Sequence, residues 1–112
     1  MKRLAIVLLL CAATGAAHSG FDDGNKLHTQ CSDMDVRTGN TMVCMSVAGA
    51  YYDMMEMIGY RCRFSKGITK GQAADVLRKY LNDHPATRNQ PAASLAFAAF
   101  KEAFACELKL NP

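Results

Sequence analysis

The sequence predicts an all-α fold, a small disulfide-stapled helical bundle of about four helices. Apolar residues recur at helical spacing in several segments of the 112-residue chain. No stretch shows the sustained alternation of apolar and polar residues that a half-buried strand requires. Four cysteines follow the N-terminal segment, and an even number of cysteines favours disulfides in an oxidising compartment.

The N-terminal segment has the parts of a secretory signal peptide. A charged start precedes a short apolar run at residues 4–11, and small residues follow as far as Ala17. The run is too short to cross a bilayer comfortably, so we expect cleavage near Ala17. An uncleaved anchor is one alternative. Lipidation at Cys11 is another, although Leu10 is not the small residue that a lipidation signal normally has before its cysteine.

Residues 1–17 are therefore interpreted as a cleaved signal, and residues 18–112 as a single domain of about 95 residues. Loss of Lys2 and Arg3 lowers the formal net charge from +3 to about +1. This balance argues against a nucleic-acid-binding face and against a polybasic membrane patch. No second apolar run is long enough to span a membrane.

The first two helices are expected early in this domain. Asp23 or Asn25 can cap a short helix that ends near Cys31, and a polar loop at residues 32–39 follows. The second helix should run over about residues 40–57, because apolar residues recur there at 3.6-residue spacing.

The second helix is apolar on two sides. The side expected to face the core carries Val43, Val47, Ala50, Tyr51, Met54 and Ile58. The opposite side carries Met45, Gly49, Tyr52 and Met55. Met45, Tyr52 and Met55 are therefore candidates for contact with a partner or with a second copy. Half-burial within the bundle explains these three residues nearly as well.

The third helix has the clearest boundaries. Thr69 and Gln72 fit a capping box, in which each side chain accepts a hydrogen bond from the other residue's backbone N–H. The pair His84-Pro85 should end the helix, because the residue before a proline is driven out of the helical region.

The fourth helix should begin near Pro91, which suits a first-turn position, and run to about Phe104. Small residues form one side of it, namely Leu95, Ala96, Ala99 and Ala103. A bulky side expected to fill the core carries Phe97, Phe100 and Phe104.

The four cysteines allow three pairings, and helix topology favours one of them. Cys31 and Cys44 lie at the same end of a helical hairpin. Cys62 and Cys106 follow the second and fourth helices, which run in the same direction in an up-down bundle. We therefore predict the disulfides Cys31–Cys44 and Cys62–Cys106.

The sequence predicts no catalytic residues, no metal site and no cofactor. It contains no HExxH, GxSxG or phosphate-binding loop, and its three histidines are far apart. Asp53 and Glu56 share a helix side, but no base or nucleophile accompanies them, so they are interpreted as a solvated stripe. A copper site is disfavoured because the helix spreads its methionines around the whole circumference, at Met42, Met45, Met54, Met55 and Met57.

The order of several short motifs resembles the Rap/Tai immunity proteins of type VI secretion systems. The resemblance covers most of residues 18–112. It rests on Gly24-Asn25-Lys26-Leu27, Cys31, Cys44, Asp53, Cys62, Gly67-Ile68-Thr69-Lys70-Gly71-Gln72, Tyr80-Leu81-Asn82-Asp83-His84-Pro85, Pro91-Ala92-Ala93 and Phe104-Ala105-Cys106. The chain departs from the family pattern where Ala105 replaces a proline, where Arg63-Phe64-Ser65 follow the third cysteine, and where Val47 and Ala50 flank Gly49.

The resemblance implies a small helical protein of the Gram-negative periplasm that is not an enzyme. Such a protein binds a secreted peptidoglycan amidase effector, occludes its active site, and often pairs as a homodimer. The alternative is a periplasmic chaperone of the acid-stress kind that binds unfolded clients. A net charge near +1 and few acidic clusters argue against its sharp acid trigger.

Overall fold

The computed structural model describes residues 22–32, 39–64 and 66–109. The elements follow in the order α2 (Gly24–Ser32), α3 (Asn40–Met57), β1 (Tyr60–Cys62), α4 (Lys70–Asp83), a 3-10 turn η2 (Pro85–Thr87), α5 (Ala92–Phe104) and β2 (Cys106–Leu108). The predicted signal peptide and most of the predicted loop at residues 32–39 lie outside the described residues. The four α-helices confirm the predicted fold class.

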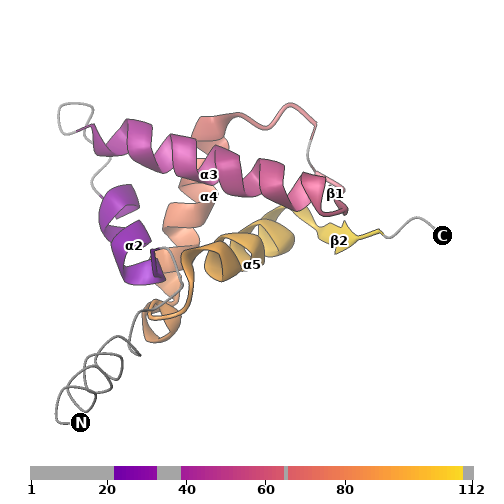
Figure 1. The fold of residues 1–112 in the computed structure, drawn as a ribbon. Helices are drawn as coiled ribbons and strands as arrows, with labels where there is room; N and C mark the ends of the chain where they lie inside the picture. The colour runs from indigo at the N-terminus through magenta and orange to yellow at the C-terminus, as the bar shows by residue number, and fades with distance from the viewer. Residues whose placement is uncertain (1–21, 33–38, 65, 110–112) are drawn as a thin grey trace, which may run out of the picture.

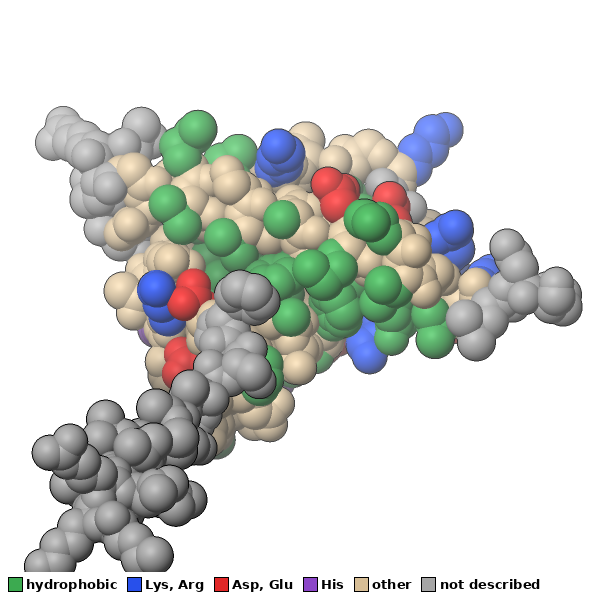
Figure 2. Space-filling view, viewed as in Figure 1, with side chains coloured by type: hydrophobic (Ala, Val, Ile, Leu, Met, Phe, Trp, Pro, Cys, Tyr) green, Lys and Arg blue, Asp and Glu red, His purple; other side chains and the backbone are tan. Residues whose placement is uncertain are grey.

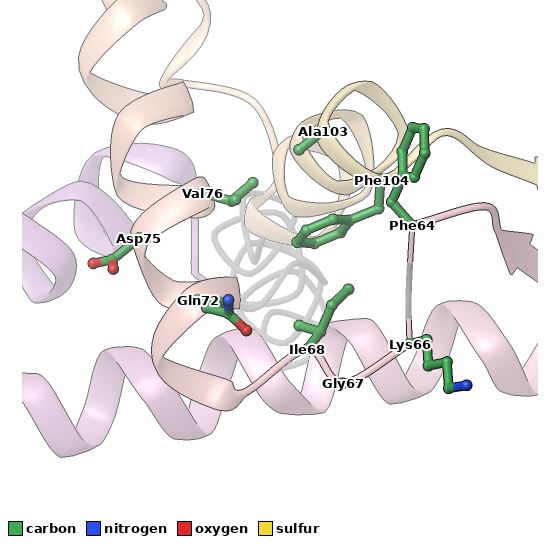
Figure 3. Close-up of a pocket in the computed structure, with 9 residues that line it drawn as sticks. All are labelled: Phe64, Lys66, Gly67, Ile68, Gln72, Asp75, Val76, Ala103 and Phe104. Atoms are coloured by element: carbon green, nitrogen blue, oxygen red, sulfur yellow. The ribbon is translucent and has the colours of Figure 1, made fainter.

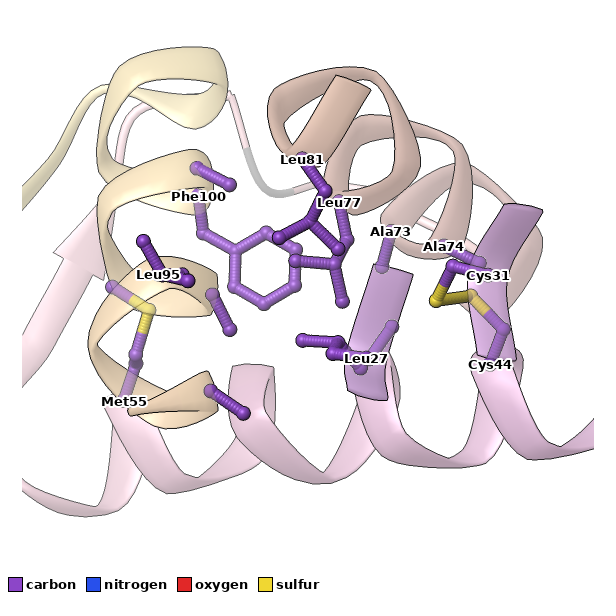
Figure 4. Packing of buried hydrophobic residues seen from close by; sticks show 14 of the residues in the cluster. Leu27, Cys31, Cys44, Met55, Ala73, Ala74, Leu77, Leu81, Leu95 and Phe100 are labelled. Atoms are coloured by element: carbon purple, nitrogen blue, oxygen red, sulfur yellow. A yellow bond between two sulfur atoms is a disulfide. The ribbon is translucent and has the colours of Figure 1, made fainter. Parts of the chain in front are cut away.

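Helix α3 is the element to which the others attach. It packs against α2, α4 and α5, with α2 beside its N-terminal part and the two short strands at its other end (Figure 1). Phe100 lies at the centre of the core and is fully buried, as are Leu77 and Leu81 of α4 and Leu27 of α2 (Figure 4). A single core therefore joins all four helices.

Local hydrogen bonds set the helix boundaries much as predicted. Asp23 caps α2, with its Oδ1 accepting from the Lys26 backbone N–H at 3.0 Å. The capping box of α4 is present: the Gln72 N–H donates to Thr69 Oγ1 at 3.1 Å, and the Thr69 N–H donates to Gln72 Oε1 at 2.9 Å. These bonds satisfy backbone donors that a helix start would otherwise leave open.

The connection from α4 to α5 is held by one arginine. Helix α4 ends at Asp83, one residue before His84, as the proline predicts. Arg88 then folds back, and its Nε donates to the Leu81 carbonyl at 2.7 Å. This bond satisfies one of the carbonyls left open at the end of α4. Pro91 stands just outside α5 as its N-cap, whereas a first-turn position was expected.

Both predicted disulfides are present. Cys31–Cys44 joins α2 to the start of α3 across 13 residues of chain, and Cys62–Cys106 joins the ends of α3 and α5 across 44 residues. Cys62 and Cys106 are also direct neighbours in an antiparallel ladder between β1 and β2. Neither strand is expected from the sequence, because each has only three residues, too few for an alternation signal.

The structure corrects which side of α3 faces the core. The fully buried residues of α3 are Cys44, Ala48 and Met55. Of the side expected inside, Val47 and Tyr51 are partly buried against the core. Val43, Ala50, Met54 and Ile58 are exposed. The expectation was wrong because α3 is apolar on most of its circumference, so periodicity alone does not rank its sides.

Helix α5 needs a smaller correction. Its buried face combines members of both predicted sides, with Leu95, Ala96 and Ala99 beside Phe100 and Phe104. Phe97 is only partly buried and Ala103 is exposed. Phe97 packs instead against Tyr60 of β1, with 6.3 Å between ring centroids. The alanines bring α4 and α5 close while the phenylalanines fill the space towards α3.

We predict opposite effects for the same substitution at two glycines. In Gly24→Ala the new methyl group would lie 2.7 Å from the Arg88 carbonyl oxygen, so the free energy of unfolding should fall by about 1–3 kcal/mol. Gly71→Ala is the matched control. Its methyl group would meet nothing closer than 3.8 Å, and the lost freedom of the unfolded chain should raise stability by about 0.4–1 kcal/mol. Urea denaturation of the oxidised proteins measures both. Unchanged stability in Gly24→Ala would contradict the close approach of α2 to residue 88.

A second matched pair tests the orientation of α3. Met55→Ala should lower the free energy of unfolding by about 2–5 kcal/mol, because Met55 is fully buried and its loss leaves a cavity in the core. Met54→Ala should change it by no more than about 0.5 kcal/mol in the monomer, because Met54 is 44% exposed there. Urea unfolding of dilute, monomeric protein gives both values. Equal costs, or a larger cost at Met54, would mean that α3 is rotated from the orientation described.

Candidate partner-binding surfaces

The three residues predicted to contact a partner lie mostly inside the bundle. Met55 is fully buried. Tyr52 is partly buried, and its ring meets Phe100 and Phe104 edge-on at centroid distances of 5.7 and 6.0 Å. Met45 is also partly buried against the core. Met45 and Tyr52 are thus half-buried in the bundle, which was the alternative interpretation. Met55 is inaccessible to a partner in this conformation.

A different part of α3 is apolar and largely exposed. We call it the α3 stripe; it consists of Val43, Val47, Ala50, Met54 and Ile58, of which Val47 is partly buried and the other four are exposed. Val43, Met54 and Ile58 are 40%, 44% and 51% exposed. Hydrophobic side chains gather along α3 and continue towards β2 (Figure 2). Leu108 of β2 extends the apolar surface past the helix end, because it lies beside Gly59. Contiguous exposed apolar surface of this kind marks interaction sites.

The borders of the α3 stripe are weakly charged. Helix α3 contains no lysine or arginine, and its two carboxylates, Asp53 and Glu56, line a separate hollow with Met57 and Arg61. Tyr51 lies beside the stripe, and burial raises the pKa of its phenol, with Asp22 adding to the effect. Tyr51 is therefore neutral at physiological pH and adds no charge of its own to this edge of the stripe.

A second surface lies between α4 and the C-terminal end of α5. We call it the Phe64 groove; it has a volume of about 480 Å³ and is lined by apolar Phe64, Ile68, Val76, Ala103 and Phe104 and by Lys66, Gly67, Gln72 and Asp75 (Figure 3). Phe64 is 63% exposed. Its position follows from the β1–β2 ladder, which continues past the strands: the Phe64 N–H donates to the Phe104 carbonyl at 3.2 Å.

A third hollow, of about 300 Å³, separates α4 from α5 nearer the end of α4. Its border carries the ion pair Lys79–Asp83, with 2.6 Å between nitrogen and oxygen, and a His84 ring stacked on Tyr80. The hydrogen bond from Lys79 lowers the pKa of Asp83 and raises that of Lys79. Both side chains are exposed, so this pair contributes little to stability.

The described residues offer little for chemistry or for membrane insertion. No group of three or more His, Cys, Asp or Glu side chains in residues 22–32, 39–64 and 66–109 converges as metal ligands would. Over the same ranges, every helix is too short or too polar to cross a bilayer. What the geometry presents is two surfaces suited to protein contact, the α3 stripe and the Phe64 groove.

Sequence reasoning missed both surfaces for different reasons. The periodicity of α3 shows that the stripe is apolar but leads to the expectation that it faces the core. For Phe64, the sequence shows only that Arg63-Phe64-Ser65 depart from the family pattern. One available signal could have found the stripe: Cys44 must face α2 to pair with Cys31, and this orients α3 so that Ala48, Tyr51 and Met55 point inwards.

Comparison with known proteins agrees with the motif order seen in the sequence. The family model of the Rap1a immunity proteins matches residues 23–106, which span all the described helices and both disulfides. No curated protein and no solved structure gives a significant match. The family match covers well over half of the chain, and the chain therefore belongs to the Rap1a immunity protein family.

Proposed function

We propose that this immunity protein acts in the periplasm, where it binds a secreted peptidoglycan amidase effector of a type VI secretion system and occludes its active site. The observation that carries the proposal is exposed apolar surface on a disulfide-stapled member of the immunity family. Of the seven large hydrophobic side chains exposed among the described residues, five lie on α3 or directly after it. Occlusion needs complementary surface and no catalytic group.

The covalent structure supports the proposed location. Two disulfides persist only in an oxidising compartment, and they staple a domain whose core is small. The signal peptide expected at residues 1–17, cleaved near Ala17, would deliver residues 18–112 there.

We further propose that the α3 stripe pairs with the same stripe of a second copy. The stripe is symmetric about its middle: in an antiparallel pair of helices, Val43 would lie opposite Ile58 of the second copy and Val47 opposite Met54. The small Ala50 would lie at the two-fold axis, where it lets the helices approach closely. Apolar groups meet apolar groups along the whole contact, and neither Asp53 nor Glu56 belongs to it.

The immunity function predicts protection in cells. Cells that express the full-length chain should survive export of the matching amidase effector to their periplasm, and purified protein should abolish peptidoglycan cleavage at equimolar concentration. Candidate effectors are the secreted amidases encoded beside this gene. The matched control is the same chain without residues 1–17, which stays in the cytoplasm and should not protect.

Failure to bind or inhibit any of these amidases would contradict the proposal. The chaperone alternative would gain support if the protein then suppressed aggregation of model clients near pH 3.

The homodimer predicts a specific dissociating variant. Met54→Glu places a carboxylate in the middle of the apolar contact and should convert a dimer of the purified protein to a monomer at micromolar concentration, as measured by light scattering after gel filtration. Met42→Glu is the control: Met42 is 67% exposed but lies off the α3 stripe, so its dimer should persist. A wild-type monomer at 100 μM, or a Met54→Glu dimer, would rule this contact out.

A further inference from the structure

Phe64 is an exposed aromatic side chain on a rigidly held backbone. It follows β1, and the Cys62–Cys106 disulfide lies two residues before it. The Arg63 N–H donates to the Ala105 carbonyl and the Phe64 N–H to the Phe104 carbonyl, both at 3.2 Å. Because its backbone is already held, this residue loses little backbone freedom on binding, which suits a binding anchor.

One basic side chain lines the groove together with Phe64. It is Lys66, which is exposed and forms no ion pair with a carboxylate of the described residues. Asp75, the carboxylate that lines the groove, pairs with Arg78 at 3.2 Å. Arg63 lines a separate hollow with Glu107. Lys66 is therefore the cation that the groove can offer to a partner.

The floor of the groove adds a second apolar element. Ile68, Val76, Ala103 and Phe104 line it together with Phe64 (Figure 3). No residue of α3 lines the groove, so a second copy on the α3 stripe and a partner on the Phe64 groove would use different residues.

We propose that Phe64, with Lys66 on the same groove, is the anchor through which this protein binds its effector. The effector face that fits has an apolar recess for the ring, bordered by an Asp or Glu side chain for Lys66. An apolar side chain from the edge of that recess then packs into the Phe64 groove. This assignment rests on the proposed immunity function and names the surface and the partner chemistry that carry it out.

Binding kinetics with a catalytically inactive form of the matching amidase test the assignment. Phe64→Ala should raise the dissociation constant at least about 10-fold, chiefly through faster dissociation. Lys66→Ala should lower the association rate constant and flatten its dependence on salt concentration. Met42→Ala is the matched control, because Met42 is 67% exposed and lies on α3, and it should change binding less than about threefold.

The outcomes separate this assignment from the function on which it rests. Phe64 is largely exposed, so its alanine variant should keep the wild-type unfolding temperature, and circular dichroism verifies this. If the wild-type protein binds the amidase and Phe64→Ala binds within threefold of it, the anchor is wrong and the immunity function stands. If the wild-type protein binds none of the amidases encoded beside its gene, both the Phe64 anchor and the proposed immunity function are wrong.

Discussion

The buried disulfide between Cys31 and Cys44 determines how the longest helix sits in this protein. Cys44 is fully buried and bonded to α2, so α3 cannot rotate about its own axis without breaking that contact. At 3.6 residues per turn, Ala48, Tyr51 and Met55 then point in the same direction as Cys44. The α3 stripe is left outside. One covalent bond thus decides which side of α3 is buried and which apolar side stays exposed, although the composition of the helix does not distinguish them.

The second disulfide has a different structural role. Cys62–Cys106 closes a 44-residue segment, and in the chain-entropy model such a closure stabilises the fold by about 4 kcal/mol, against about 3 for the shorter one. It also aligns β1 with β2, and that ladder holds Phe64 against the end of α5. The same bond that stabilises the domain therefore positions the proposed anchor. Ala105, in the left-handed conformation at φ 49°, turns the chain from α5 into β2.

A protein that works by occlusion needs stable, complementary surface more than it needs reactive groups. The two surfaces described here differ in chemistry. The α3 stripe is apolar and uncharged, which suits contact with an identical copy, since a like charge at the centre of a two-fold interface would meet itself. The Phe64 groove combines an aromatic ring with an exposed lysine, which suits a different molecule that presents a carboxylate. This contrast is the physical basis for assigning one surface to each partner.

Local interactions explain why much of the fold could be predicted from the sequence. The capping box of Thr69 and Gln72, the Asp23 cap and the stop before Pro85 each involve residues a few positions apart, so the sequence shows them directly. The disulfide pairing followed from helix order alone. The family could also be recognised, because its motifs keep their order along the chain.

Tertiary structure decided what depends on residues distant in sequence. Which side of α3 is buried follows from the elements that pack on it, and the short β1–β2 ladder exists only because Cys62 and Cys106 meet. The exposure of Phe64 is likewise set by the end of α5, some 40 residues away along the chain. The sequence by itself determined the helices, the disulfides and the family. Only tertiary packing decided which apolar residues remain exposed, because the burial of a side chain depends on the elements that pack around it and these are distant in sequence.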